Sequence, residues 1–388
     1  MNGWTVRWSN HFLFYKAGTP TIGITFIFRL WALDSPFGYI HNGRAREVSV
    51  MFHMTMEGTR APELVGDEQD WINSEPLMLR NMSGKIILID IWDYTCVNCL
   101  RTLPYIKEWY ERYKNWGLVV IGIHTPEFEF ARSKKNVEAA VRRLGITYPV
   151  LLDNNRTNWD NYANRYWPRK FLIDSDRVIV HDHIGEGGYA ETEAAIQKMI
   201  RARYPDADLP RIMEPVRVED EPGAVCYPVT PETYAGYRHR ALGNPEDYQP
   251  NVAHSYTDPA KHSDGLIYLR GAWLATPEAL IHARITEEPE DYLALKYHAL
   301  EVNVVIKPEN DAEFDVFVTH DGKPLQLEDR GEDIRFTNEG MAYIHVDQPR
   351  MYKIVRNPRF GSHELRLSST SNAFGIYAFT FGSCKEPD

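Results

Sequence analysis

The chain has 388 residues, of which 54 are acidic and 43 are basic, and its net charge at pH 7 is −11. This length allows two or three domains. The acidic balance, without a basic patch, argues against nucleic acids and anionic membranes as partners. Four cysteines are few enough to permit a reducing compartment.

The N-terminal segment fits poorly with the rest of the chain. Residues 21–33 are apolar, but they are too few for a membrane span, contain Arg29 and lack a small-residue cleavage site. Either this segment is accessory, or translation begins in nature at Met51, Met54 or Met56. Without an export signal the chain as it stands is expected in the cytoplasm, and an extracytoplasmic location is the alternative.

A buried strand is predicted over residues 85–92. Its residues are apolar apart from Asp90, as in a strand that is buried on both faces. Burying a carboxylate is costly unless it is protonated or has a partner. Two interpretations of Asp90 stay open. It is either a proton acceptor for a nearby thiol or a structural carboxylate capped by backbone amides.

The motif Cys96-Val97-Asn98-Cys99 follows this strand and begins a predicted helix. An apolar stripe marks the helix at Leu100, Leu103, Ile106, Tyr110 and Tyr113, and Pro104 is expected to kink it. A helix N-terminus favours a thiolate, so the pKa of Cys96 is expected to be lowered. Cys96 is then the nucleophile, and Cys99 resolves the mixed disulfide. Half of a zinc site, or two core cysteines, are the alternatives on spacing alone.

Three further elements are predicted after this helix. Residues 118–125 form a strand, an apolar stripe predicts a helix that ends at Gly145, and residues 148–153 form another strand. Next, Pro168 precedes an apolar strand, where a cis X-Pro bond is plausible. A cis proline facing the two cysteines would expose backbone groups to a docking peptide.

Histidines offer a metal-binding alternative. His181 and His183 alternate along one predicted strand and share a face, so with the two thiols they would complete a Cys2His2 zinc set in ligand type. Nothing in the sequence brings them near Cys96. His124 ends the strand after the active-site helix, either lining the edge of the site or forming a strand-end turn. The glycines of residues 185–188 predict a turn before the final helix of this half.

The second half of the chain has a different texture. Residues 205–223 are acidic and Pro-rich without periodicity, which is typical of a linker. Short alternating runs then predict strands over residues 266–269, 298–306, 314–318, 342–346, 352–355, 364–367 and 374–381. Asp321-Gly322 predicts a hairpin turn. Because helix patterns are nearly absent, an all-β sandwich or jelly roll is expected.

Together the motifs resemble the thioredoxin superfamily in its TlpA/DipZ-like branch. The resemblance covers Pro62 to Tyr204 and implies an α/β fold, a central mixed sheet flanked by helices. By it, Cys96 is the nucleophile, Cys99 the resolving thiol, Asp90 the buried carboxylate and Pro168 the cis-proline. No cofactor is implied beyond a Cys96–Cys99 redox disulfide, and no metal. Thr95 and the dipeptide Val-Asn depart from thioredoxins proper, so a redox potential does not transfer.

The order of both halves is similar to the soluble portion of the DipZ family, from Pro62 to Gly382. It implies four segments: an N-terminal segment over 1–56, a thioredoxin-like domain over 57–204, a linker over 205–250 and a carbohydrate-binding-module-like sandwich over 251–388. A possible carbohydrate ligand follows from the resemblance. An aromatic platform for it could be made by Tyr268, Trp273, Tyr297, Tyr352 and Tyr377, although these residues are better explained as the core of a sandwich.

The sequence therefore predicts a thiol–disulfide oxidoreductase that reduces or exchanges disulfides in proteins. Its electrons are expected from another protein, because the membrane domain that supplies them in the DipZ family is not seen in this chain. The alternative is a glycan- or protein-binding module whose CxxC is secondary, either redox-active or metal-binding. The remaining cysteines, Cys226 and Cys384, flank the predicted sandwich and are expected to take no part in turnover. Their pairing stays open.

Overall fold

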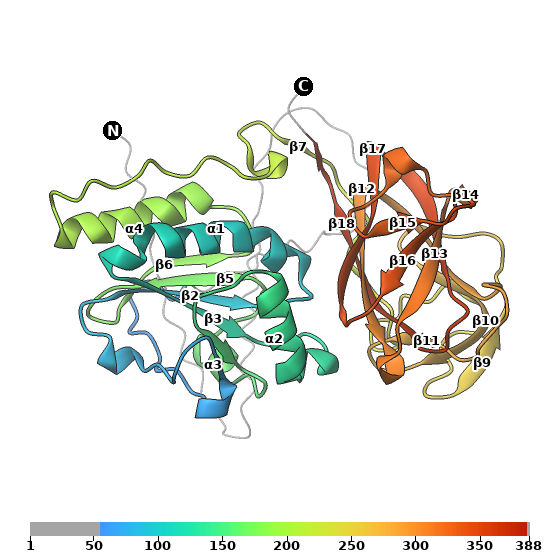
Figure 1. Cartoon of the computed structure of the whole chain (residues 1–388), viewed down its shortest axis with the longest axis horizontal. Coiled ribbons are helices and arrows are strands. Elements are labelled where there is room, and N and C mark those ends of the chain that lie inside the picture. The colour runs from blue at the N-terminus through green and yellow to red at the C-terminus, as the bar shows by residue number, and fades with distance from the viewer. Residues whose placement is uncertain (1–54, 386–388) are drawn as a thin grey trace, which may run out of the picture. The chain divides into compact units, whose positions relative to one another are not determined.

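The computed structural model describes residues 55–385 (Figure 1). The expectations for the segment over 1–56, including the apolar run of residues 21–33 and the start sites Met51 and Met54, lie outside the described residues except at its last two positions. None of the described helices is long and apolar enough to cross a membrane.

A six-stranded mixed sheet organises the first half of the described chain. Its order is β1-β4-β3-β2-β5-β6. The strands are β1 (Trp71–Ile72), β2 (Ile86–Trp92), β3 (Leu118–His124), β4 (Val150–Leu152), β5 (Arg169–Ile173) and β6 (Ile179–Ile184). Strand β2 is parallel to β3 and antiparallel to β5. This central position explains why all seven of its residues are buried, and the expected thioredoxin-like fold is confirmed.

Helices cover both faces of this sheet (Figure 1). They are α1 (Val97–Tyr113), α2 (Lys134–Arg143), α3 (Thr157–Asn161) and α4 (Tyr189–Arg203). Because side chains alternate along a strand, Leu88 and Trp92 join the core that contains α1 and α4, whereas Ile89 and Ile91 join the core that contains α3. Asp90 lies between Leu88 and Trp92 in this alternation, so its side chain is directed to the same side of the sheet as theirs, which is the side that carries the cysteines.

Short 3-10 helices connect these elements and those of the second half. They lie at Glu68–Asp70, Leu79–Asn81, Lys114–Trp116, Glu129–Arg132, Val218–Asp220, Glu309–Asp311 and Leu327–Asp329. Helix α1 is continuous through Pro104. The stripe that ends at Gly145 corresponds to α2, and the glycine turn precedes α4 with Gly188 as its N-cap residue at φ 58°. The predictions of α2 and of the glycine turn are confirmed, and the expected kink at Pro104 stays a prediction.

The second half is all-antiparallel. Its strands are β8 (Thr233–Tyr234), β9 (Ala253–Tyr256), β10 (Ile267–Ala275), β11 (Leu280–His282), β12 (Tyr292–Pro308), β13 (Phe314–His320), β14 (Lys323–Pro324), β15 (Ile334–Phe336), β16 (Ala342–Val346), β17 (Arg350–Ser368) and β18 (Phe374–Gly382). They form one 11-stranded array. Asp321 and Gly322 join β13 to β14, both with positive φ, as the hairpin signature predicts.

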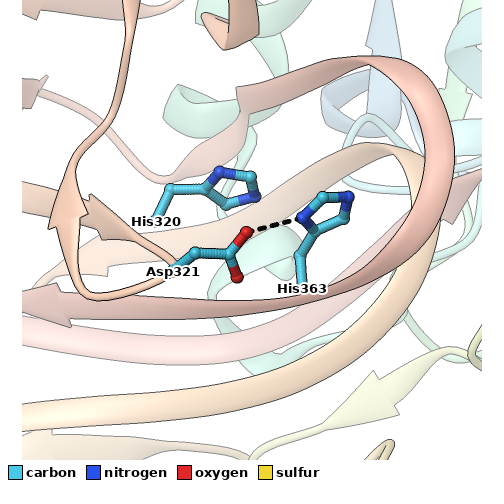
Figure 2. A group of neighbouring side chains, drawn as sticks. All are labelled: His320, Asp321 and His363. Carbon is cyan, nitrogen blue, oxygen red and sulfur yellow. Dashed lines mark hydrogen bonds and ion pairs between the residues drawn. The ribbon is translucent and has the colours of Figure 1, made fainter.

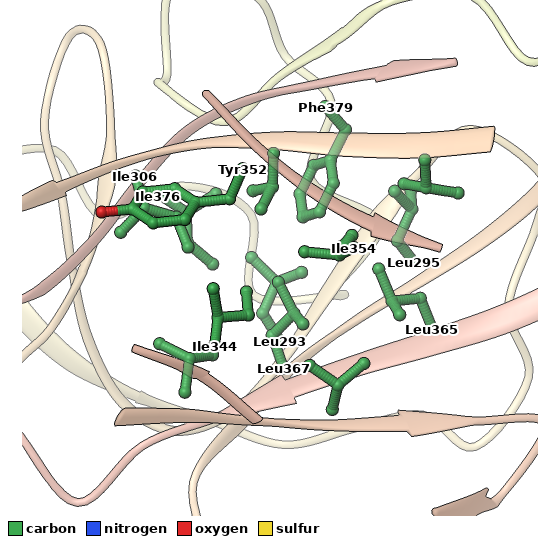
Figure 3. Packing of buried hydrophobic residues seen from close by; sticks show 14 of the residues in the cluster. Leu293, Leu295, Ile306, Ile344, Tyr352, Ile354, Leu365, Leu367, Ile376 and Phe379 are labelled. Carbon is green, nitrogen blue, oxygen red and sulfur yellow. The ribbon is translucent and has the colours of Figure 1, made fainter. Parts of the chain in front are cut away.

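The array folds on itself because one strand changes partners. β12 pairs with β17 along most of its length, but its other edge pairs first with β10 and then with β18. Register shifts after Ala299 and Val302 mark this exchange, and such irregularities let a strand pass from one layer to another. The two layers enclose an aliphatic core (Figure 3) that includes Leu293, Leu295, Ile344, Leu365, Leu367 and Phe379.

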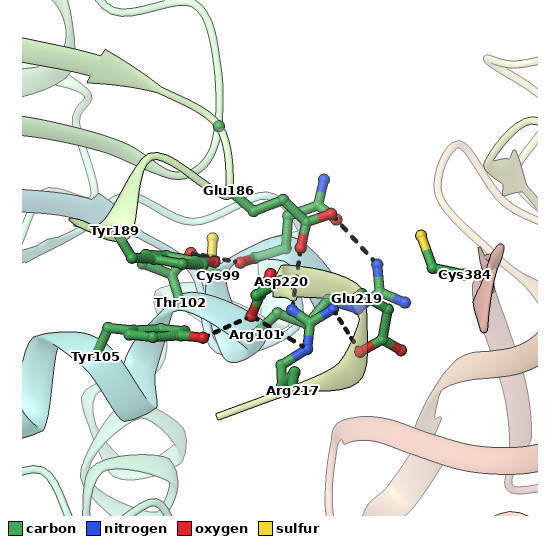
Figure 4. A network of polar contacts seen from close by, with 12 residues as sticks. Cys99, Arg101, Thr102, Tyr105, Glu186, Tyr189, Arg217, Glu219, Asp220 and Cys384 are labelled. Atoms are coloured by element: carbon green, nitrogen blue, oxygen red, sulfur yellow. Dashed lines mark hydrogen bonds and ion pairs between the residues drawn. The ribbon is translucent and has the colours of Figure 1, made fainter. Parts of the chain in front are cut away.

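The stretch predicted as a linker packs on the first half. Tyr105 of α1 donates a hydrogen bond to Asp220 Oδ2 at 2.8 Å and accepts one from the amide of Val216 at 2.9 Å. Arg217 pairs with Glu186 at 3.2 Å, and Arg101 reaches the same carboxylate at 3.4 Å (Figure 4). Asp220 of this stretch therefore has a partner on α1, and Arg217 has one before α4.

All described residues belong to one compact unit, and the two halves are joined by an aromatic cluster. The rings of Phe128 and Phe130 lie 5.4 and 4.8 Å from that of Tyr377 on β18, in edge-on geometry. Such aromatic pairs contribute about 0.5–1.5 kcal/mol beyond the area that they bury. This contact brings the edge of the sandwich beside the residues that follow β3.

A disulfide closes the second half. Strands β7 (Val225–Cys226) and β19 (Cys384–Lys385) pair through Cys226 and Cys384, whose sulfurs are bonded across a sequence separation of 158 residues. The pairing that the sequence left open is therefore formed. It joins the start of this half to its end.

The first prediction concerns this disulfide. The double variant Cys226→Ala, Cys384→Ala should lose about 2–5 kcal/mol of unfolding free energy under oxidising conditions, because a long loop is no longer closed in the unfolded chain. Its rate of insulin reduction should stay at the wild-type value. Urea unfolding and a turbidity assay measure the two effects, and a loss of turnover with unchanged folding would show that a second redox pair relays electrons.

Candidate active site

Cys96 and Cys99 lie at the start of α1. Cys96 is the N-cap residue, with φ −77° and ψ 116°, and its Sγ accepts a hydrogen bond from the amide of Cys99 at 3.3 Å. Cys96 is half-buried, whereas Cys99 is 1% exposed, and both thiols are free. A substrate can therefore reach Cys96, whereas Cys99, one helical turn further along α1, is shielded from it. This arrangement supports the predicted order of attack and resolution.

The pKa of Cys96 differs from the sequence-based expectation. Burial raises it, and the negative charges of Glu127 and Asp93 raise it further, against a lowering effect of the hydrogen bonds with Cys99. The helix N-terminus is present as predicted, but desolvation outweighs it. Burial also raises the pKa of Cys99 well above its usual range. The expectation of a lowered pKa at Cys96 is therefore wrong.

Asp90 lies buried in β2 on the cysteine side of the sheet. It is 1% exposed, its Oδ1 has no hydrogen-bond partner, and burial raises its pKa to about 7. The charge of Asp90 in turn raises the pKa of Cys99. A carboxyl group that gains and loses its proton near neutral pH is suited to take the proton of a resolving thiol. This geometry supports the proton-acceptor interpretation of Asp90.

Lys170 is a neighbour that the sequence interpretation missed. It is opposite Asp90 in the β2–β5 ladder, is fully buried, and donates from Nζ to the Gly185 carbonyl at 2.9 Å. Burial lowers its pKa to about 8, against the raising effect of Asp90 and Cys99. The sequence does contain a signal for this residue. Lys170 directly precedes the apolar run 171–173 of β5, which is buried throughout like β2, and a lysine in a buried strand indicates a charged partner nearby.

Two carboxyl groups, Asp93 and Glu127, lie near enough to Cys96 for their charges to act on its thiol. Asp93 accepts from the Thr95 amide at 2.6 Å and from the Glu127 amide at 2.7 Å. Burial raises the pKa of Glu127 to about 8, helped by the charges of Glu232 and Asp93. Tyr234, on β8 of the second half, donates its hydroxyl hydrogen bond to Glu127 Oε1 at 2.5 Å. The sandwich half thus contributes side chains to the surroundings of the thiols.

Pro168 follows a cis peptide bond from Trp167, as expected. Its carbonyl accepts a hydrogen bond from the Gly185 amide at 2.8 Å. The Trp167 indole donates to the Thr125 carbonyl at 3.0 Å and packs on Trp159, with ring centroids 4.2 Å apart. Trp167 contacts the same apolar cluster as Cys96 and Cys99. These contacts anchor the proline segment between the apolar clusters on the two faces of the sheet.

The predicted histidine ligands are engaged elsewhere. His181 Nε2 hydrogen-bonds Thr192 at 3.0 Å, and His183 Nε2 hydrogen-bonds the Glu186 carbonyl at 3.2 Å, both on the outlying strand β6. Among residues 55–385 they form no ligand group with the two thiols. His124 is fully buried, stacked on Tyr94 and 3.9 Å from Asp93. It therefore lies beside the carboxyl cluster and not in an exposed turn.

The proposed aromatic platform is buried. Tyr268, Trp273, Tyr297, Tyr352 and Tyr377 are all less than 9% exposed. They are core residues, as the alternative interpretation of the sequence held. The surface of the sandwich half has a separate polar pocket, whose lining includes Asp258, Arg270, Asp291, Tyr292 and Arg366.

Comparisons with known proteins match two families to this chain. The Redoxin family matches residues 56–199, and the thioredoxin-like C-terminal domain family matches residues 230–382. Protein DipZ of Mycobacterium tuberculosis is 33% identical over 331 residues, which cover 83% of this chain and 43% of DipZ. The thiol–disulfide oxidoreductase ResA of Bacillus thuringiensis is 28% identical over 142 residues, 37% of this chain and 78% of ResA.

The chain thus contains a Redoxin domain and a thioredoxin-like C-terminal domain, and it is similar to the TlpA/DipZ-like thiol–disulfide oxidoreductases. A solved thioredoxin-like protein in its oxidised form aligns at 25% identity and a TM-score of 0.35, over 38% of this chain and 99% of that chain. A DsbE-type thiol:disulfide interchange protein from Chlorobium tepidum aligns at 18% identity and a TM-score of 0.33, over 37% and 97%. The chain spans less than half the length of the DipZ proteins that it matches.

The second prediction concerns Asp90 and pH. Its pKa in the folded protein is above that of the unfolded chain, so its contribution to stability is fully present below about pH 4 and is lost as the pH rises through about 7. Asp90→Asn should therefore raise the unfolding free energy at pH 8.5 relative to wild type, by no more than about 4 kcal/mol. This gain in unfolding free energy is partly offset, because the variant removes the negative charge of Asp90 that stabilises the positive charge of Lys170.

Urea unfolding at pH 5 and pH 8.5 measures this effect, with the exposed Asp176→Asn as the matched control. An Asp90→Asn variant whose gain is the same at both pH values would show that Asp90 does not titrate near neutrality.

The third prediction tests the carboxyl cluster. Glu127→Gln removes a negative charge near Cys96 and should lower the apparent pKa of that thiol. Tyr234→Phe should act in the same direction but more weakly, because its hydroxyl favours the charged form of Glu127. The pH profile of iodoacetamide alkylation in the reduced protein measures both shifts. Tyr377→Phe, which changes a tyrosine of the same aromatic cluster, is the control, and equal profiles for all three variants would contradict the assignment.

Proposed function

We propose that this protein uses the Cys96–Cys99 pair to reduce or exchange disulfide bonds in other proteins. The observation that carries the proposal is the make-up of the site: a half-buried thiol at a helix N-terminus, a buried thiol one helical turn further along, and a buried carboxyl group whose charge acts on the second thiol. Attack, resolution and proton transfer each have one side chain suited to them.

The reaction proceeds in two exchanges. The Cys96 thiolate attacks one sulfur of the substrate disulfide, which forms a mixed disulfide and releases the other substrate sulfur as a thiolate that takes up a proton. Asp90 then accepts the proton of Cys99. The Cys99 thiolate attacks Cys96 Sγ, the second substrate thiolate leaves, and the enzyme holds a Cys96–Cys99 disulfide. A dithiol on a separate donor protein reduces this disulfide and completes the cycle.

The pKa directions favour a reductant. An oxidising CxxC owes its potential to a reduced form that is stabilised as a thiolate. Here burial raises the pKa of both cysteines, and the charges of Glu127 and Asp93 oppose a thiolate at Cys96. Raised thiol pKa values do not stabilise the reduced form as a thiolate, so we propose that this protein donates electrons to its substrate.

A peptide substrate fits the surface beside Glu127. A pocket there is lined by acidic and basic side chains, among them Glu127, Arg132, Arg156, Arg238 and Glu278. Both halves of the chain contribute to it, and its mixed charge suits backbone and side-chain contacts of an extended segment. The neighbouring Pro168 segment would hold the peptide from the other side. Pro168 is in this proposal a substrate-docking residue.

The sandwich half supports a second, binding role. The polar pocket at Asp258, Tyr292 and Arg366 combines hydrogen-bonding groups with an aromatic ring, as sugar sites require, and a carbohydrate is proposed as its ligand. Retention on immobilised glycans, lost on Tyr292→Ala, tests this candidate.

The Cys226–Cys384 disulfide supports an extracytoplasmic location. Structural disulfides persist in oxidising compartments and are rare in the cytosol. We therefore favour the alternative location over the cytoplasm that the sequence first indicated. Thiol labelling of the protein in intact source cells measures the state of these two cysteines.

The fourth prediction separates the roles of the two thiols. Cys96→Ser should abolish insulin reduction, whereas Cys99→Ser should accumulate mixed disulfides because the bond to the substrate is no longer resolved. Non-reducing electrophoresis and mass spectrometry detect the trapped species, and the Cys226→Ala, Cys384→Ala variant controls for cysteine loss. Normal turnover by Cys99→Ser would mean that the assigned roles are wrong.

A further inference from the structure

A group of potential metal ligands lies in the sandwich half, apart from the redox site. Within residues 55–385 the structure brings together His320, Asp321 and His363, with one ligand atom from each within 4.8 Å of the others. His320 ends β13, Asp321 begins the hairpin turn, and His363 comes from β17 (Figure 2). We propose that these three side chains form a binding site for a divalent cation of the zinc type.

Figure 2 shows the two imidazoles and the carboxylate side by side, with a hydrogen bond between Asp321 and His363. The rings of His320 and His363 are stacked, with centroids 4.7 Å apart and an interplanar angle of 27°. Asp321 Oδ2 lies 2.8 Å from His363 Nδ1. Two histidines and one carboxylate are a ligand set that zinc accepts, with water in the remaining position. Asp329, whose Oδ2 lies 4.0 Å from His320 Nδ1, is a further carboxylate within reach.

Neighbouring groups hold these side chains in place. His320 is 8% exposed, and its Nε2 is 2.9 Å from the Tyr297 hydroxyl, to which Asn357 also donates at 3.2 Å. Asp321 Oδ1 accepts from the Glu364 amide at 2.8 Å, which leaves Oδ2 directed at the histidines. Such supporting contacts orient metal ligands and reduce the rearrangement that binding requires.

A similar His–Asp contact lies elsewhere on the same sheet. His345 and Asp315, directly opposite each other on β16 and β13, also form a His–Asp contact of 2.8 Å, and Glu313 is 3.5 Å from the same ring. That pair has carboxylates but no second imidazole. It therefore provides a matched control on the same sheet, with similar chemistry and an incomplete ligand set.

The experiment uses the full chain with Cys96 and Cys99 oxidised, so that the thiols do not bind metal. Equilibrium dialysis against Zn²⁺ measures stoichiometry and affinity, and Co²⁺ substitution reports the coordination sphere through its visible absorption. The test variants are Asp321→Asn, which keeps the turn and an acceptor for the Glu364 amide, and His363→Ala. His345→Ala is the control.

One zinc per chain is expected for wild type and His345→Ala, with affinity at least about tenfold weaker in Asp321→Asn and His363→Ala. The thermal midpoint should rise with Zn²⁺ only in the first two proteins. Metal-free thermal midpoints equal to wild type show that the variants are folded. No bound zinc in wild type, or equal binding by all four proteins, would overturn the proposal, since the metal would then be absent or held elsewhere.

Discussion

The central constraint of this fold is a buried pair of titratable side chains in the middle of its mixed sheet. Asp90 and Lys170 face each other across β2 and β5, with burial raising the pKa of the acid and lowering that of the base. Because both shifts bring the pKa values towards neutrality, both side chains change their charge near neutral pH. The apolar strands provide this low-dielectric environment, and the alternation of side chains along β2 directs the carboxyl group to the helix that carries the thiols. Fold and reactivity are therefore set by the same burial.

The two halves of the chain share the surroundings of the thiols. Tyr234 reaches Glu127 from the sandwich half, and the acidic stretch before it is attached to α1 through Tyr105 and to Glu186 through Arg217. A linker free in solution would leave these charges solvated. The contacts of Val216, Arg217 and Asp220 instead restrict the position of the second half. Its side chain Tyr234 is therefore held where it can influence the pKa of Glu127 beside the thiols. The electrostatics of the site belong to the whole described unit.

Local signals predicted much of this structure. The apolar run of β2, the helix stripe of α1, the cis bond before Pro168 and the Asp321-Gly322 turn follow from residues adjacent in sequence. Features that depend on contacts between distant residues could not be predicted in this way. Lys170 lies opposite Asp90 only because β2 pairs with β5. The pKa of Cys96 is raised by burial, which no local sequence pattern reveals. β17 was predicted as two strands because its middle is polar and exposed, yet its backbone pairing with β12 continues on both sides of a bulge.

The Cys226–Cys384 bond also has a mechanical meaning. It links the first and last short strands of the second half, so tension applied to the chain on either side passes through the covalent bond and bypasses the sandwich core. Under load, the six-stranded sheet with its thiols would unravel while the sandwich kept its shape. Reduction of that one bond would move the load onto the hydrogen bonds between β12, β17 and β18. We therefore expect the resistance of this half to force to fall when that bond is reduced.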